Sequence, residues 1–340
     1  MPRSLNTKLV LFSLLAWIAV GCKKDTPQPS GGSNPPNQEE CHDYVFNGGE
    51  VFDTYITTGV QYARPFFNPN NGDEFVYVRS GTGTYTELVK RKISTGQETI
   101  LCNSLMIPSQ PQWGKQGWIV FSTLSLTTWK IYEDGTGLSQ ISPSGVECYD
   151  PIISESGDKF FGGGIPFTVY GYAPAVFGLN GAVVDSILCQ HGSISLGRLA
   201  AGEQDFKNGY YHFYDSSEPV ENFGYCKLNN NQSVDKLTSF SMNDGEDVGA
   251  CRNNENLYYA LYKNGLYRLN LVSRQVDKIM ECCQSRFIMS LSMSPDGKSI
   301  IFERVRGHQT TPGGMVIDEQ SEIFLYNLIT KKETKILWEE

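Results

Sequence analysis

The chain has 340 residues, of which 40% are hydrophobic and 19% are charged, and its formal net charge is −9. Proteins that bind phosphate backbones carry clustered Lys and Arg, but the basic residues here form only short local groups, at Lys90–Lys92 and Lys331–Lys332. The composition therefore argues against nucleic acid as a partner.

The first 21 residues have the pattern of an export signal. Arg3 and Lys8 precede an apolar segment, Leu9–Val20, whose single polar residue is Ser13. As a helix this segment would be about 18 Å long, well short of the roughly 30 Å hydrocarbon core of a bilayer. We expect residues 1–21 to be a signal peptide that is removed rather than a permanent transmembrane helix.

The sequence Ala19-Val20-Gly21-Cys22 resembles the lipobox of bacterial lipoproteins. The resemblance implies cleavage before Cys22 and a covalent lipid on its thiol, which would anchor the mature chain to a membrane. The alternative is an ordinary secretory signal with an incidental cysteine. Lys23 directly after the cysteine resembles lipoproteins sent to the outer membrane, and the Cys-Lys-Lys-Asp start is similar to lipoproteins of the Bacteroidota. Both the periplasmic side and the cell-surface side of the envelope stay open.

Residues 23–40 form a linker with four prolines and no aliphatic or aromatic side chain. Such a segment cannot bury apolar surface, so we expect it to be extended and disordered. At about 3.1 Å per residue it would reach about 50 Å. The predicted domains are therefore a signal peptide at 1–21, a lipidated cysteine with a disordered linker at 22–40, and a folded domain at 41–340.

Eight cysteines follow Cys22, an even number in a chain expected to reach an oxidising compartment. This favours structural disulfides, although eight cysteines allow 105 pairings and the sequence does not choose among them. A zinc site or a redox pair is the alternative, but no Cys-x-x-Cys motif occurs. The eight are Cys41, Cys102, Cys148, Cys189, Cys226, Cys251, Cys282 and Cys283.

The folded part repeats one pattern: a turn rich in Asn, Asp, Pro and Gly, then strands rich in β-branched and aromatic residues joined by tight turns. These are signals of antiparallel hairpins, and no segment of ten residues has the apolar spacing of a helix. The second strand of each unit begins near Phe75, Trp118, Phe160, Tyr210, Leu257 and Ile300, which gives spacings of 43, 42, 50, 47 and 43 residues.

This spacing is typical of a β-propeller blade of four strands. The sequence therefore predicts an all-β fold, a six-bladed β-propeller of four-stranded antiparallel blades, in which the fourth unit is the least regular. Residues 51–62 could supply a closing strand that joins the first and last blades.

The string Ser294-Pro295-Asp296-Gly297-Lys298-Ser299-Ile300-Ile301-Phe302, followed by Glu322–Leu328, resembles the propeller repeat of the TolB family. The resemblance is specific in the last unit and partial in the first. It implies a TolB-like six-bladed propeller and a protein-binding role in the cell envelope. It also implies that Asp296 and Gly297 serve the turn between the innermost strand and the next one, without a catalytic role. TolB itself has a further domain before its propeller, where this chain has the linker.

Residues that could carry chemistry are few. The histidines, His42, His191, His212 and His308, could in principle meet in the channel and bind a metal, but no two are close enough in sequence to form a local ligand pair. We expect them to be solvent-facing or hydrogen-bonded, and we predict no metal and no cofactor other than the lipid on Cys22.

Two other segments are read as structural, and a nucleophile motif is absent from the sequence. Gly162-Gly163-Gly164 is not followed by the helix or the Lys-Ser/Thr of a phosphate site. The acidic segment 243–247 departs from the calcium loop and reads as a solvated connection. No Gly-x-Ser-x-Gly motif occurs, so the sequence predicts no catalytic residue and no enzymatic activity.

The leading hypothesis is a membrane-anchored envelope lipoprotein, with an outer-membrane location, whose propeller acts as a protein-binding module. The alternative is a surface lipoprotein that binds or processes carbohydrate, because exposed aromatic rings can stack on sugars. The segment from Gly162 to Gly178, rich in Tyr and Gly, is the candidate loop for either partner, an envelope protein or a glycan.

Overall fold

The computed structural model describes residues 44–46, 50–52, 59–142, 149–154, 157–163, 174–186, 190–191, 194–200, 206–217, 222–241, 247–261, 264–282, 287–310 and 316–337. The chain divides into two compact units, Met1–Glu39 and Glu40–Glu340. The signal peptide, Cys22 and the linker all lie outside the described residues. Within the described part, no helix is long and apolar enough to cross a membrane.

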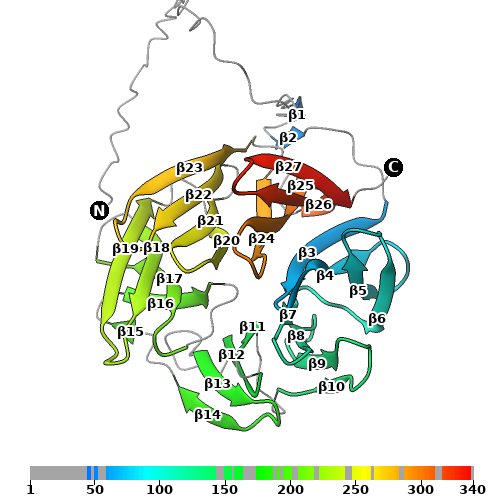
Figure 1. Ribbon diagram of the computed structural model, residues 1–340, viewed down its shortest axis with the longest axis horizontal. Helices are drawn as coiled ribbons and strands as arrows, with labels where there is room; N and C mark the ends of the chain where they lie inside the picture. The colour runs from blue at the N-terminus through cyan, green and yellow to red at the C-terminus, as the bar shows by residue number, and fades with distance from the viewer. Residues whose placement is uncertain are drawn as a thin grey trace, which may run out of the picture. The chain divides into compact units, whose positions relative to one another are not determined.

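Six antiparallel sheets follow one another along the second unit and are arranged around a common centre (Figure 1). In each sheet the strands lie side by side in sequence order. Blade 1 consists of β3 (Gln61–Asn68), β4 (Asn71–Ser80), β5 (Thr86–Lys92) and β6 (Glu98–Leu105). Blade 2 consists of β7 (Gln112–Trp113), β8 (Trp118–Ser122), β9 (Thr128–Tyr132) and β10 (Ser139–Gln140). Blade 3 consists of β11 (Tyr149–Ile153), β12 (Lys159–Gly163), β13 (Pro174–Gly178) and β14 (Val183–Ser186).

The other three blades complete the ring. Blade 4 consists of β15 (Gln190–His191), β16 (Ile194–Leu199), β17 (Tyr210–Asp215), β18 (Asn222–Leu228) and β19 (Val234–Ser241). Blade 5 consists of β20 (Asp247–Arg252), β21 (Asn256–Leu261), β22 (Gly265–Asn270) and β23 (Val276–Glu281). Blade 6 consists of β24 (Phe287–Met293), β25 (Ser299–Thr310), β26 (Val316–Asn327) and β27 (Lys332–Leu337). A separate hairpin, β1 (Tyr44–Phe46) with β2 (Glu50–Phe52), precedes the blades.

The predicted six-bladed architecture is confirmed. Five of the six marker residues lie in the second strand of their sheets, and Tyr210 begins β17, which follows the first long strand of blade 4. The irregularity of the fourth unit has a structural basis, because the two-residue strand β15 adds a fifth strand to that sheet through the pair His191–Ile194.

The prediction that residues 51–62 supply a strand closing the ring is wrong for the described residues. β2 pairs with β1, and β3 pairs with β4 as the first strand of blade 1. Blade 6 is complete without an exchanged strand, since its order is β24-β25-β26-β27. The first and last blades are joined by side chains instead.

One of these joining groups is the carboxylate of Glu303, whose side chain is buried. Its Oε2 accepts a hydrogen bond from the backbone amide of Arg64 in blade 1, at 3.0 Å, and its Oε1 accepts one from the Ser321 hydroxyl, at 2.7 Å. Gln110, between blades 1 and 2, donates from Nε2 to the carbonyl oxygens of Pro65 and Leu291. Hydrogen bonds between side chain and backbone thus cross the junction between blades 6 and 1.

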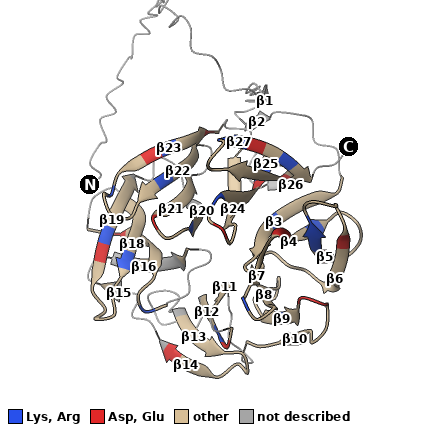
Figure 2. Ribbon diagram, in the orientation of Figure 1, with Lys and Arg blue, Asp and Glu red and all other residues tan. Residues whose placement is uncertain are grey.

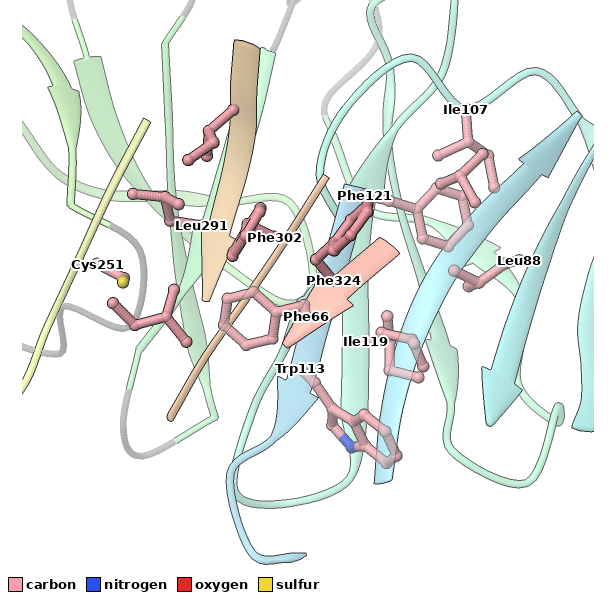
Figure 3. Packing of buried hydrophobic residues seen from close by; sticks show 14 of the residues in the cluster. Phe66, Leu88, Ile107, Trp113, Ile119, Phe121, Cys251, Leu291, Phe302 and Phe324 are labelled. Atoms are coloured by element: carbon pink, nitrogen blue, oxygen red, sulfur yellow. The ribbon is translucent and has the colours of Figure 1, made fainter. Parts of the chain in front are cut away.

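Apolar side chains fill every interface between neighbouring blades. The largest cluster runs from blade 5 through blades 6 and 1 to blade 2, and Figure 3 shows part of it, including Phe66, Phe302 and Phe324. Separate clusters lie between blades 6 and 1, 2 and 3, 3 and 4, and 4 and 5. Each blade hides both of its faces against its neighbours, which is why a unit that could not fold alone is stable in the ring.

The expectation of disulfides is wrong for the four cysteines that the structure describes. Cys102, Cys226, Cys251 and Cys282 are free thiols. Cys226 and Cys251 are fully buried in apolar clusters, where a thiol packs as a small hydrophobic group. Cys41, Cys148, Cys189 and Cys283 lie outside the described residues.

Candidate functional site

A cavity of about 620 Å³ lies at one end of the central channel. The first strands of neighbouring blades contact one another. β24 contacts both β20 and β3, and β7 contacts both β3 and β11, so these strands surround the channel. The cavity is lined by the last residues of β3, β7, β11, β20 and β24 and by the turns that follow them. Five of the six blades thus bring the same part of their repeat to one place, which we call the channel-mouth cavity.

The turns around this cavity share one construction. In blade 6 the Ser294 hydroxyl accepts a hydrogen bond from the amide of Ser299, at 2.9 Å, and in blade 3 the Ser154 hydroxyl does the same for Lys159, at 3.2 Å. In blade 5 the side-chain oxygen of Asn253 accepts from the amides of Glu255 and Asn256. Small polar side chains satisfy the turn amides, and this gives the cavity a rigid rim.

Gln112 in β7 is the most unusual residue of the lining. Its side chain is 4% exposed overall and forms part of the cavity wall. The next residue, Trp113, is 2% exposed, also lines the cavity, and has an indole Nε1 with no hydrogen-bond partner. A buried donor without a partner costs free energy, so the indole Nε1 of Trp113 and the nearby Gln112 side chain make this cavity the candidate binding site for a polar ligand.

Both signs of charge surround the cavity. Arg252 lies over the ring of Tyr210, with its guanidinium carbon 5.2 Å from the ring centroid. Opposite in sign, Asp296 accepts hydrogen bonds from the Ser294 hydroxyl, at 2.7 Å, and from the amide of Lys298, at 3.1 Å. The hydrogen bond from Ser294 is the main reason that the pKa of the Asp296 carboxyl is lowered. Across the blades as a whole, Lys and Arg are interspersed with Asp and Glu (Figure 2).

The predicted histidines have separate positions. His212 is buried in β17 among aromatic rings, with its ring centroid 4.7 Å from that of Tyr214 and 5.5 Å from that of Phe223. His191 lies at the edge of the same sheet in β15, His308 lies in β25 of blade 6, and His42 is outside the described residues. In the described part of the chain, no three His, Cys, Asp or Glu side chains form a cluster suited to a metal ion.

The candidate loop is shorter than predicted. Gly162 and Gly163 belong to β12, where they pair with Ala175 and Pro174 of β13, so the glycines form part of the blade instead of a phosphate-type loop. Residues 174–178 are β13, whereas residues 164–173 of that segment and residues 243–246 of the acidic segment lie outside the described residues. The sequence analysis did not identify Gln112 as a candidate binding residue. The pattern that could have indicated it is a polar residue next to a tryptophan in the first strand of a blade.

No protein-family model and no curated protein matches the chain, but its fold matches those of solved structures. A TolB protein from Agrobacterium tumefaciens matches with a TM-score of 0.56 and 13% identity, over 74% of this chain and 88% of that protein. TolB from Acinetobacter baumannii matches with a TM-score of 0.50 and 13% identity, over 82% of this chain and 63% of that protein. The fold is a TolB-like six-bladed β-propeller.

In this TolB-like propeller the turn that resembled the TolB repeat in sequence lies on the rim of the channel-mouth cavity. It joins β24 to β25, Asp296 accepts the turn hydrogen bonds, and Gly297 has a φ of 69° that favours glycine. The interpretation of Asp296 and Gly297 as turn residues is therefore confirmed. At this level of identity the likeness to TolB is one of fold alone.

Proposed function

We propose that this chain is an envelope lipoprotein, anchored at the outer membrane through acylated Cys22, whose propeller binds a segment of another envelope protein in the channel-mouth cavity. The lipobox and the linker support the anchoring. The observation that carries the binding role is the cavity of about 620 Å³, whose lining includes Gln112 and the buried indole Nε1 of Trp113, which has no hydrogen-bond partner.

The chemistry of the cavity suits a polypeptide. A carboxamide offers one acceptor oxygen and two donor hydrogens, which complement the C=O and N–H of a peptide unit. Arg252 and Asp296 on the rim can select side chains of either sign, and the apolar surfaces of Phe66 and Ile153 can take aliphatic side chains. Apolar walls with a few convergent polar groups are typical of binding pockets.

Photo-crosslinking in native envelopes tests this function. A photoreactive amino acid at Asn254, an exposed residue of the lining, is expected to capture a specific protein. The same residue at Val272, which is exposed in the turn between β22 and β23 and is not part of the lining, is the matched control. Capture at both positions alike, or binding of a glycan in place of a protein at Asn254, would contradict the proposal.

The anchoring is tested separately. Intact mass measurement of the mature chain is expected to show a diacylglycerol adduct on Cys22, and the Cys22→Ser variant is expected to lose both the adduct and its recovery with membranes. An unmodified Cys22 in the mature chain would overturn the anchor and leave the binding role of the cavity to its own test.

A further inference from the structure

The face of the propeller opposite the channel-mouth cavity has an uncharged patch on blades 1 and 2. Three segments form it: residues 80–86, 103–110 and 122–128. None of their residues is charged, although 19% of the chain is charged, and most are Ser, Thr, Gly or apolar residues. Each segment also has one large apolar side chain that stands out into solvent, and the exposed fractions are 50% for Tyr85, 39% for Met106 and 66% for Leu124.

Hydrogen bonds hold the three segments together as one surface. The Thr86 hydroxyl donates to the carbonyl oxygen of Leu105, at 3.0 Å, and accepts from the amide of Ile107, at 2.9 Å. The amide of Leu124 donates to the carbonyl oxygen of Met106, at 3.0 Å. We call the surface presented by Tyr85, Met106 and Leu124 the apolar patch.

The loop that carries Leu124 has a fixed shape. Its hydroxyl groups bond to one another, with Thr123 Oγ1 2.7 Å from Thr127 Oγ1 and 2.9 Å from Ser125 Oγ. Leu126 in the same loop has a φ of 60°, a left-handed conformation that is unfavourable for a residue with a Cβ. A hydroxyl network thus maintains a strained turn in which Leu124 is 66% exposed.

The chain enters the propeller beside this patch. β3 begins at Gln61, which pairs with Ser80, and Gly81 lies so close to the preceding segment that a Cβ on it would be 2.4 Å from the carbonyl oxygen of Gly59. The chain therefore enters blade 1 at this face, next to the loop that carries Tyr85, and Cys22 and the linker precede this point in the sequence.

From this placement we infer that the apolar patch docks on the bilayer surface to which the chain is anchored; the inference rests on the proposed lipid anchor at Cys22. Loss of Arg3 and Lys8 with the signal peptide gives the mature chain a net charge of about −11, so an anionic membrane surface repels most of the molecule. The apolar patch and its three segments contain no carboxylate, so this part of the face can approach the surface. The nearest charged pair, Arg79 and Glu87, is neutralised internally by an ion pair of 2.6 Å.

The side chains of the patch fit the bilayer interface. A tyrosine ring prefers the headgroup level, leucine and methionine can enter the acyl boundary, and Ser and Thr hydroxyls can bond to headgroup oxygens. The contact need not be strong, because a tether of this length keeps the propeller at an effective concentration in the millimolar range at the surface. The opposite face, with the channel-mouth cavity, would then point away from the membrane toward its partner.

Hydrogen exchange on vesicles tests the docking. The acylated chain is reconstituted on vesicles of phosphatidylethanolamine and phosphatidylglycerol, and amide exchange is compared with that of the soluble Cys22→Ser chain. Peptides covering residues 80–86, 103–110 and 122–128 are expected to exchange more slowly on vesicles, by a factor of about 3 to 10. Peptides from the cavity rim at 252–255 and 294–298 are expected to exchange at the same rate in both samples.

Variants separate docking from anchoring. The triple change Tyr85→Ser, Met106→Ser and Leu124→Ser is expected to float with vesicles but to lose the protection, and the single change Leu124→Ser is expected to lose part of it. Val272→Ser with Ile329→Ser, which removes two exposed apolar residues from the turns of the cavity face, is the matched control and is expected to keep it.

The outcomes distinguish the two ideas. An acylated chain that floats with vesicles while its three segments exchange at the soluble rate overturns the docking and leaves the anchor standing. If the three segments of the triple variant still exchange more slowly on vesicles, the docking of the apolar patch is overturned as well. A chain that carries no lipid and does not float removes the premise, which mass measurement and flotation show before any exchange is measured. Unchanged exchange in blades 3–6 of the triple variant establishes that it is folded.

Discussion

The backbone amide of Phe67 in blade 1 donates a hydrogen bond to the hydroxyl of Ser292 in blade 6, 3.1 Å away, across 225 residues of sequence. Ser292 is buried, so this bond is protected from competing water. Because the described blades exchange no strand, this bond, the Glu303 contacts and the apolar cluster between blades 6 and 1 close the ring.

Ser292→Ala should therefore destabilise the propeller. The change leaves the buried Phe67 amide without an acceptor, which costs about 1–3 kcal/mol of the free energy of unfolding. Urea unfolding followed by tryptophan fluorescence measures the loss. Ser239→Ala, at an exposed position of β19, is the matched control and should change stability by less than about 0.5 kcal/mol. Equal effects of the two changes would mean that the closing bond contributes nothing.

Blade 4 depends on a close backbone approach at Gly224 in β18. A Cβ at this position would lie 2.1 Å from the carbonyl oxygen of Thr238 in the paired strand β19. Gly224→Ala is expected to destabilise the protein by about 1–3 kcal/mol, because backbone must move to make room. Gly83→Ala has open space around its Cβ and serves as the control. A Gly224→Ala protein as stable as the control would contradict the tight packing of β18 against β19.

The blade count followed from sequence because it is encoded locally. Turn residues such as Pro295, Asp296 and Gly297 specify turns, and runs of β-branched and aromatic residues specify strands, so each repeat is visible without knowledge of its neighbours. The way the ring closes is a long-range choice. The apolar and aromatic residues of segment 51–62 fit a strand, but nothing in the segment states whether its partner is blade 6 or blade 1.

The cysteines and the cavity were misread or missed for a similar reason. Cys226 and Cys251 occupy buried core positions, and in sequence a buried thiol cannot be told from half of a disulfide. Gln112 became a candidate only when five blades were seen to meet around it. The sequence shows its polarity, whereas its burial and its place in the cavity lining are properties of the assembled ring.

The described cysteines should behave as free, unreactive thiols. Burial raises the pKa of the Cys226 thiol to about 12 and that of Cys282 to about 11, and it also raises the pKa of Cys251. Since the thiolate is the reactive form, iodoacetamide at neutral pH should leave Cys226 and Cys251 unmodified in the folded protein. In urea without a reducing agent both should be alkylated, as peptide mass spectrometry would show. Alkylation that requires prior reduction would mean that they form disulfides.

Blade 1 should lose stability in acid through Glu98. Burial alone would raise the pKa of this carboxyl, but hydrogen bonds from the Tyr77 hydroxyl, at 2.9 Å, and from Arg91, at 2.6 Å, with the charge of Arg79, outweigh it and lower the pKa. A folded-state pKa below the unfolded value of about 4.3 means that the stabilisation is present above that pH and is lost as the pH falls through the folded-state pKa.

Glu98→Gln should accordingly lower the urea midpoint at neutral pH and reduce the difference between the midpoints at about pH 7 and about pH 3. Glu255→Gln, which changes an exposed carboxylate on the cavity rim, is the control and should leave that difference unchanged. A Glu98→Gln protein with the full wild-type loss of stability in acid would show that the acid sensitivity arises elsewhere.

Gln112→Leu separates the stability of the propeller from its binding. Leucine has a similar size and no polar atoms, so it removes the carboxamide from the cavity lining and keeps the side-chain volume. The free energy of unfolding should change by less than about 1.5 kcal/mol, because the replacement has a similar volume. Partner capture by the photoreactive residue at Asn254 should fall sharply in the same variant. Urea unfolding and crosslinking yield, measured on one preparation, check both effects. A loss of stability with normal capture would show that Gln112 supports the fold and has no part in binding.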